Sequence, residues 1–180
     1  MPEMLDDAAL LKQIALGDQP AFERLAAAYH PRLWRYLARH LDPGTVEEVL
    51  QDIYLAIWRA AGSFRGTARP STWIFQIAHH HMVDSYRTSG RHEEHLDRFA
   101  EEDQQTTPSP EQAITDRVDL AAALRFLSPR HLETLDLVYF HGFTIAETAR
   151  ILDVPPGTVK SRLSHAREQL HIVLEQGAFS

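Results

Sequence analysis

Apolar residues recur at spacings of three and four positions along most of the chain. In the segment from Phe22 to Leu41, this spacing places one set of apolar residues on a single face: Phe22, Leu25, Ala26, Tyr29, Leu33, Trp34, Leu37 and Leu41. Such spacing is the period of an amphipathic helix, whereas the strict alternation that is typical of a half-buried strand is nearly absent. The pattern predicts an all-α protein.

Start and stop residues divide this pattern into separate helices. The first is expected from Leu5 to Leu16 and is closed by Gly17. Asp18 and Pro20 supply the start of the second helix, in which Pro31 is expected to introduce a kink.

Two further helices are expected in the first ninety residues. Thr45 and Glu48 have the spacing of a capping box, and the helix that they open ends at Gly62. Its predicted buried stripe consists of Val49, Leu50, Ile53, Ile57 and Trp58. The fourth helix is expected from Trp73 to about Thr88, with Ser71 as its N-cap.

The charge is unevenly distributed. The net charge is -7, and residues 92–116 contain one basic and eight acidic residues, whereas basic and acidic residues balance on either side. Residues 91–110 end in TTPSP, a composition typical of a solvated linker. The sequence therefore predicts two small helical domains, 1–90 and 111–180, joined by a flexible acidic linker over 91–110.

The second domain is also expected to be helical. Residues 111–127 form its first predicted helix. Ser128 and Pro129 begin the next helix, which Gly142 ends.

A short helix, a turn and a longer helix follow. Thr144 and Glu147 repeat the capping-box spacing, the helix that they open reaches Leu152, and Pro156 occupies the first position of the next helix. This order is typical of a helix-turn-helix, whose second helix enters the major groove of DNA. The stretch from Val154 to Arg167 contains three Lys or Arg residues and no acid, so positive charge is concentrated there.

The two faces of this second helix differ in chemistry. An advance of about 100° per residue places Val159, Leu163, Ala166 and Leu170 inward. The opposite face presents Gly157, Ser161, Ser164 and His165. Small polar residues can approach base edges, while long cationic side chains and the amides at the helix start reach phosphates. The candidate DNA contacts are Thr158, Lys160, Ser161, Arg162, His165 and Arg167; the alternative is that the basic residues merely solvate an exposed helix.

The composition excludes several kinds of chemistry. The chain has no cysteine, so it can form neither a disulfide framework nor a thiolate metal site. Its start carries acids where a signal peptide carries bases, and it contains no run of about 18 apolar residues. We expect a cytoplasmic protein with no direct membrane insertion.

Clustered histidines suggest a metal site, but their spacing argues against one. His79, His80 and His81 are consecutive, and consecutive helical side chains diverge by about 100°. The sequence HEEH, from His92 to His95, lacks the i, i+4 pair of a helical zinc motif. We expect no metal and no cofactor.

Three sequence stretches resemble one family, the extracytoplasmic-function (ECF) branch of bacterial sigma factors. GTVKSRL, at 157–163, resembles the family's minus-thirty-five-reading segment. VEEVLQDIYLAIWRAAGSF, at 46–64, resembles its polymerase-binding helix, and STWIFQIAHHHMVDSYR, at 71–87, resembles its minus-ten-reading helix. The resemblance implies a dissociable initiation subunit that binds core RNA polymerase and directs it to promoters, without catalysis of its own.

The same resemblance assigns roles to individual residues. The face presented to the clamp helices of the largest polymerase subunit would consist of Glu47, Glu48, Gln51 and Asp52, which lie off the apolar stripe of their helix. The alternative is a solvated acidic face. The family also contacts the flap region of polymerase.

Contacts with the minus-ten element are expected from the loop between Gly62 and Pro70 and from the helix that follows. The candidates are Phe64, Arg65, Arg69, Gln76, His79, His80, Tyr86 and Arg87. An aromatic side chain and glycines can accept a displaced base, and arginines can contact phosphates. Trp73 is expected to anchor the helix to the core.

The chain departs from the family pattern at four of these positions. Gln76, His79 and His80 replace two arginines and an asparagine, and His165 stands where arginine is common. Permanent charge is lost there, because neutral histidine attracts phosphate less than arginine does.

The resemblance also implies control by an anti-sigma factor that covers both domains. A metallohydrolase is a rival enzyme hypothesis, and it requires bound metal and turnover without polymerase. A dimeric transcription activator is a rival binding protein; it requires tight binding of duplex operator DNA by the isolated chain and leaves the first ninety residues without a purpose.

Overall fold

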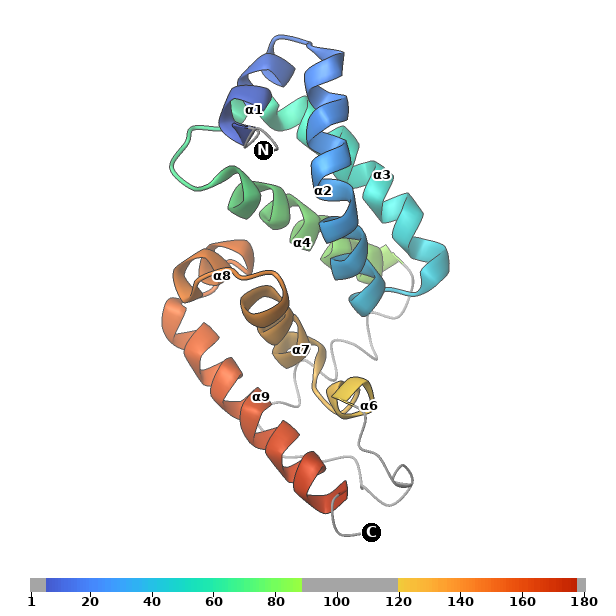
Figure 1. The fold of residues 1–180 in the computed structure, drawn as a ribbon, viewed down its shortest axis with the longest axis vertical. Helices are drawn as coiled ribbons and strands as arrows, with labels where there is room; N and C mark the ends of the chain where they lie inside the picture. The colour runs from blue at the N-terminus through green and yellow to red at the C-terminus, as the bar shows by residue number, and fades with distance from the viewer. Residues whose placement is uncertain (1–5, 89–119, 178–180) are drawn as a thin grey trace, which may run out of the picture. The chain divides into compact units, whose positions relative to one another are not determined.

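The computed structural model describes residues 6–88 and 120–177, and these residues form helices joined by turns and loops (Figure 1). This confirms the all-α prediction. Contacts divide the chain after Arg87 into two compact units, the first holding α1 to α4 and the second most of α6 to α9. The predicted linker over 91–110 lies outside the described residues.

The first unit contains four α-helices and one short 3₁₀ turn. In chain order these are α1 (Asp7–Ala15), α2 (Gln19–His40), α3 (Pro43–Ala60), the turn η1 (Ala61–Ser63) and α4 (Pro70–Thr88). The side chain of Asp18 caps α2 by accepting a hydrogen bond from the Ala21 amide at 2.9 Å, as predicted. Gly17 closes α1 with a φ of +86°, a conformation that glycine adopts without steric cost. Helix α2 continues through Pro31 without interruption.

Three predicted helix starts are wrong. Helix α1 begins at Asp7 instead of Leu5, and its N-cap is Asp6. The other two are the starts of α3 and α4. Helix α3 begins at Pro43, so Thr45 lies inside the first turn, and no side chain caps this helix. The Thr45 amide donates to the Asp42 carbonyl oxygen at 2.9 Å. Helix α4 begins at Pro70, so Ser71 is not its N-cap. In both cases a proline takes the first helical position, because its fixed φ suits a helix and its missing N–H costs nothing there.

Apolar residues from all four helices form the core of the first unit. The largest fully buried side chains there are Leu11, Leu25, Leu33, Tyr36, Leu37, Val46, Ile53, Ile57, Ile74 and Phe75. The Tyr36 and Phe75 rings meet edge to face with centroids 5.5 Å apart. Trp34 and Trp58, both predicted on buried faces, are each 36% exposed. Each tryptophan lies beside the buried stripe of its helix. Tyr36 on α2 and Ile57 on α3 belong to those stripes.

The second unit has shorter helices before a long last one. They are α6 (Leu120–Leu124), α7 (Pro129–Leu135), the π-helical turn η3 (Asp136–Phe140), α8 (Ile145–Ile151) and α9 (Pro156–Gly177). The described part of the helix predicted over 111–127 ends at Leu124. Ser128 caps α7 by accepting from the His131 amide at 3.3 Å, and Gly142 ends η3 with a φ of +72°.

The core of the second unit lies between α7, α8 and α9. Its buried members are Leu127, Leu135, Ala149, Val159, Leu163 and Ala166. Partly buried Leu124, Leu132, Val138, Ile145, Val154 and Leu170 surround them. This core holds α8 and α9 in a defined geometry.

Candidate nucleic-acid and polymerase interfaces

The predicted capping box of α8 is present. The Thr144 amide donates to Glu147 Oε2 at 2.9 Å, and the Glu147 amide donates to Thr144 Oγ1 at 3.2 Å. Two amides that the first helical turn leaves without an intrahelical acceptor are thus satisfied. The first helix of the helix-turn-helix therefore has a defined start.

A tight turn connects α8 to α9. Asp153 has a φ of +52°, a left-handed conformation that Asp tolerates better than most residues. The Val154 amide donates to the Ala149 carbonyl oxygen at 3.0 Å, which closes α8 in a Schellman-type arrangement. Pro156 then begins α9, as predicted.

The two faces of α9 follow the predicted division. Val159 and Ala166 are fully buried, Leu163 is nearly so, and Leu170 packs against the same core. The residues predicted on the outer face, namely Gly157, Ser161, Ser164 and His165, are all exposed. Helix α9 thus presents a face of small and polar residues to solvent.

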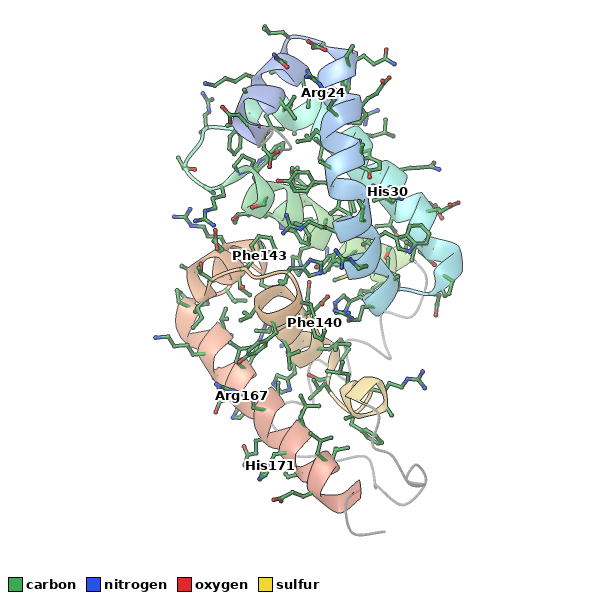
Figure 2. The ribbon with its side chains drawn as sticks, viewed as in Figure 1. Arg24, His30, Phe140, Phe143, Arg167 and His171 are labelled. Carbon is green, nitrogen blue, oxygen red and sulfur yellow. The ribbon has the colours of Figure 1, made fainter. Side chains whose placement is uncertain are left out.

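The basic residues of α9 differ in their surroundings. Lys160 and Arg167 are exposed, and Arg162 is half-buried. The Arg167 Nε donates to the Leu163 carbonyl oxygen at 3.2 Å, which holds this side chain along its own helix (Figure 2). The Ser161 hydroxyl donates to the Thr158 carbonyl oxygen at 3.0 Å.

Two of the amides at the start of α9 already have acceptors within the protein. Pro156 has no N–H, and the amides of Thr158 and Val159 both donate to the Pro155 carbonyl oxygen, at 2.9 and 3.4 Å. The amide of Gly157 is the remaining one in this first turn that could approach a phosphate. The expected phosphate contacts on this helix therefore fall mainly on its cationic side chains.

Sequence reasoning missed a residue behind α9. The ring of buried His131, on α7, meets the ring of His165 edge to face, with centroids 5.9 Å apart. The two residues are far apart in the sequence, so no local pattern indicates their contact.

The four predicted polymerase contacts on α3 share one exposed surface. At about 100° per residue they fall within an arc of about 140° on the side opposite the core. We call this surface, which consists of Glu47, Glu48, Gln51 and Asp52, the α3 polar face; all four residues are exposed. Leu55 continues it by one turn and is 50% exposed.

A row of rings lies between α2 and α3, and the sequence analysis did not predict it as a surface. Successive centroids are 5.3 Å apart for Trp58 and Phe22, 6.1 Å for Phe22 and Tyr54, 6.4 Å for Tyr54 and His30, and 6.0 Å for His30 and Trp34. We call these five residues the aromatic ladder. Its successive α2 members, Phe22, His30 and Trp34, lie eight and four positions apart, a spacing that could have indicated a shared face.

The centre of the ladder is held by hydrogen bonds. His30 Nδ1 and the Tyr54 hydroxyl lie 3.1 Å apart, and Figure 2 labels His30 on α2. Burial raises the pKa of Tyr54 to about 12. The phenol is protonated at neutral pH and can donate a hydrogen bond. The ladder is therefore an ordered surface whose two end members, Trp34 and Trp58, are partly exposed.

The predicted minus-ten loop contains one aromatic contact. The Phe64 ring meets half-buried Trp73 with centroids 5.6 Å apart, which fits the expected anchoring role of Trp73. Arg65 and Arg69 are exposed, and Gly66 has a φ of +71°. The loop thus exposes two arginines near the Phe64 ring, which packs against Trp73 on one side.

Three candidates in the first part of α4 lie close together on the helix. Gln76 and His79 are half-buried, His80 is exposed, and the two imidazole centroids are 5.8 Å apart. Burial and the neighbouring His79 lower the pKa of His80, so His80 is neutral near pH 7. His80 therefore offers hydrogen bonds rather than positive charge.

The last two candidates on α4 have partners within the protein. The Tyr86 hydroxyl donates to the His40 carbonyl oxygen, which ties the end of α4 to the end of α2. Arg87 forms an exposed ion pair with Asp84 at 3.2 Å. Both contacts compete with a role in DNA binding.

Over the ranges 6–88 and 120–177, no helix is long and apolar enough to cross a membrane. Within the same ranges, no three His, Asp or Glu side chains are grouped as they would be around a metal ion.

A helix-turn-helix with an exposed, partly basic second helix is typical of a DNA-binding protein. Comparison with known families makes this specific. Residues 25–92 match the family model described as Sigma-70 region 2, and residues 117–170 match the model described as Sigma-70, region 4.

Relatives match over nearly the full chain. The ECF RNA polymerase sigma-E factor of Escherichia coli (strain K12) is 30% identical, and the alignment covers 94% of this chain and 95% of that protein. The factor of the same name from Haemophilus influenzae is 28% identical and covers 94% of this chain and 96% of its own. The chain belongs to the ECF group of the sigma-70 family, whose members are transcription initiation factors.

Solved structures share the fold. CnrH, solved in complex with the cytosolic domain of CnrY, has a TM-score of 0.70 and 26% identity over 97% of this chain and 99% of CnrH. The sigma factor RpoE, solved with the anti-sigma factor NepR from Bartonella quintana, has a TM-score of 0.64 and 25% identity over 86% of this chain and 96% of its own.

Proposed function

We propose that this sigma factor binds core RNA polymerase through its first unit and reads promoter DNA with both units. The observation that carries the proposal is the pairing of an exposed acidic surface on α3 with an exposed basic recognition helix in a separate unit. The proposed domains are 1–90 for polymerase and the minus-ten element, 91–110 as linker, and 111–180 for the minus-thirty-five element. Such a protein acts in the cytoplasm and needs no catalytic group.

The polymerase contact is assigned to the α3 polar face together with Leu55 and the ends of the aromatic ladder. Glu48 and Asp52 supply negative charge for a basic partner, and Leu55 and Trp58 supply apolar area beside it. Charge complementarity speeds association, while buried apolar and aromatic anchors contribute most of the affinity. The clamp helices of the largest polymerase subunit are the proposed partner.

Promoter contacts are divided between the two units. In the first unit, the loop around Phe64 and the exposed side of α4 would contact the displaced strand of the minus-ten element. In the second unit, Ser161 and His165 would approach base edges, while Lys160 would contact phosphate. The second unit would also contact the flap region of polymerase.

Control by an anti-sigma factor is part of the proposal. CnrH was solved in complex with CnrY, and RpoE was solved with the anti-sigma factor NepR. By analogy, a small inhibitory protein would cover exposed surface on this chain and so compete with polymerase.

Run-off transcription tests the proposal. Core polymerase is incubated with the purified full chain and fragmented genomic DNA of the host, and transcript starts are mapped. Specific starts that require both the chain and core polymerase are expected. Core polymerase that gains no start-site selectivity, or a chain that binds duplex operator DNA tightly without polymerase, would contradict it.

A further inference from the structure

On the recognition helix α9, the exposed ring of His165 contacts a buried ring of α7. His165 lies on the outer side of α9 and is exposed, whereas His131 on α7 is 6% exposed. Their rings meet at an interplanar angle of 71° with centroids 5.9 Å apart. Both residues belong to the second unit, so the contact lies within one compact body.

We propose that His131 is a positioning residue that orients the His165 ring for base readout and so helps to set the sequence preference at the minus-thirty-five element. This inference rests on the proposed function, in which His165 approaches a base edge. An imidazole ring presents its two nitrogens to hydrogen-bond partners in fixed directions. It can distinguish bases only if its ring orientation is fixed before the helix enters the groove.

The backbone that carries His131 is itself held in place. Ser128 caps α7 through the His131 amide at 3.3 Å, and the Leu132 amide donates to the Ser128 carbonyl oxygen at 2.9 Å. Helix α7 also packs closely against α9. The backbone at His131 is therefore fixed and its side chain is buried, whereas the His165 ring that it contacts is exposed.

The contact between His131 and His165 lies on one side of α9. Helical spacing places Thr158, Arg162 and His165 toward one side of the outer surface, and Lys160 and Arg167 toward the other, about 140° or more from His165. An edge-to-face ring contact favours one orientation of the His165 ring by about two- to tenfold. Removing the contact should therefore alter base preference at the position that His165 reads, while the phosphate contact of Lys160 remains.

Promoter selectivity of the holoenzyme tests this inference. Transcription is measured from a promoter panel in which each minus-thirty-five position is varied, using the full-length chain and the variants H165A, H131A, H131F and H131A/H165A. We expect H165A to lose preference at one position, and H131A to weaken preference at that same position by about two- to tenfold. The double variant should lose no more than H165A alone, because the two residues act as one unit.

Two further variants separate positioning from folding. H131F keeps an aromatic ring behind His165 and should retain most of the preference. L135A is a matched control, because Leu135 lies one turn further along α7 and is also 6% exposed. It should lower the thermal unfolding temperature about as much as H131A does, without changing base preference.

Three outcomes would overturn the inference. The first is an H131A protein with unchanged base preference. The second is an equal loss at all promoters in both H131A and L135A, and the third is additive losses in the double variant. In each case a wild-type chain that still directs polymerase to specific starts leaves the proposed function standing, whereas a wild-type chain without such starts contradicts that function itself.

Discussion

Hydrogen-bond partners distinguish residues that hold the fold from residues that face a ligand. Tyr86 donates its hydroxyl to the His40 carbonyl oxygen, and the Arg167 Nε bonds to its own helix. Lys160 is exposed on the same helix as Arg167. A basic residue in a recognition helix is therefore a stronger candidate for DNA contact when its side chain is not already held by the protein.

Tyr29 shows a purely structural role at this scale. Its hydroxyl donates to Asp7 Oδ2 at 2.5 Å, and burial, followed by the bond to Asp7, raises its pKa. We expect Y29F to lower the free energy of unfolding by about 1–2 kcal/mol at pH 7 in urea denaturation. The control is Y139F, since Tyr139 is 58% exposed, and it should change stability little.

The raised pKa of Tyr29 also predicts a pH dependence. The folded chain retains the hydroxyl proton to higher pH than the unfolded chain, so this contribution to stability is complete below about pH 10 and is lost as pH rises toward the folded pKa. Y29F should reduce the loss of stability above pH 10. An alkaline unfolding profile identical to that of the wild type would contradict this assignment.

Lys160 should act on DNA affinity without reading sequence. We expect K160A to weaken promoter binding by the holoenzyme about equally for all minus-thirty-five variants and to reduce the salt slope of log affinity by about one. The control is K12A, which removes the chain's other lysine, an exposed residue on α1. A change in base preference in K160A would show a base contact instead.

At the scale of helices, similar sequence patterns have different structural outcomes. Thr45 with Glu48 and Thr144 with Glu147 have the same spacing, but only the second pair caps its helix in the described structure. A proline ahead of Thr45 already occupies the first helical position of α3. The capping box is thus a conditional signal that depends on which nearby residue starts the helix.

This difference can be measured directly. We expect T144A to lower the free energy of unfolding by about 1 kcal/mol, because the Glu147 amide loses its side-chain acceptor. T45A should stay within about 0.5 kcal/mol of the wild type. Urea denaturation of both variants checks the prediction, and equal losses would show that Thr45 also contributes a cap.

At the scale of the whole molecule, the two units expose surfaces of different chemistry. The first unit exposes the α3 polar face and the ends of the aromatic ladder, and the second exposes small polar and basic residues on α9. The net charge of -7 hides this difference, because the acidic excess lies in residues 92–116, outside both of these surfaces. Net charge alone would wrongly argue against a nucleic-acid partner.

Charge reversal on α3 tests the assignment of the first unit. We expect D52R to reduce affinity for core polymerase by roughly tenfold or more, since it introduces repulsion toward a basic partner. Its unfolding temperature should change little, because Asp52 is exposed. The control is E23R, an exposed reversal on α2 of the same unit. Equal affinities of D52R, E23R and wild type would remove the α3 polar face from the interface.

Most helices of the fold could be predicted, but the starts of α1, α3 and α4 and several surfaces could not. The inward face of α9 was predicted correctly because Val159, Leu163 and Ala166 repeat with the helical period. Trp34 and Trp58 were predicted to be buried because their side chains are hydrophobic. Whether a residue at the edge of the apolar face is covered depends on the neighbouring helix. The contact sites on polymerase and DNA remain proposals that the family resemblance supports.

The sequence by itself determined the helical class, the turn before α9 and the family, because these depend on local spacing, on start and stop residues and on contiguous motifs. Only the tertiary structure decided that five rings from α2 and α3 form one ladder and that His131 lies behind His165. Such contacts join residues on different helices. Their geometry depends on how the helices pack, and no periodicity within one segment contains that information.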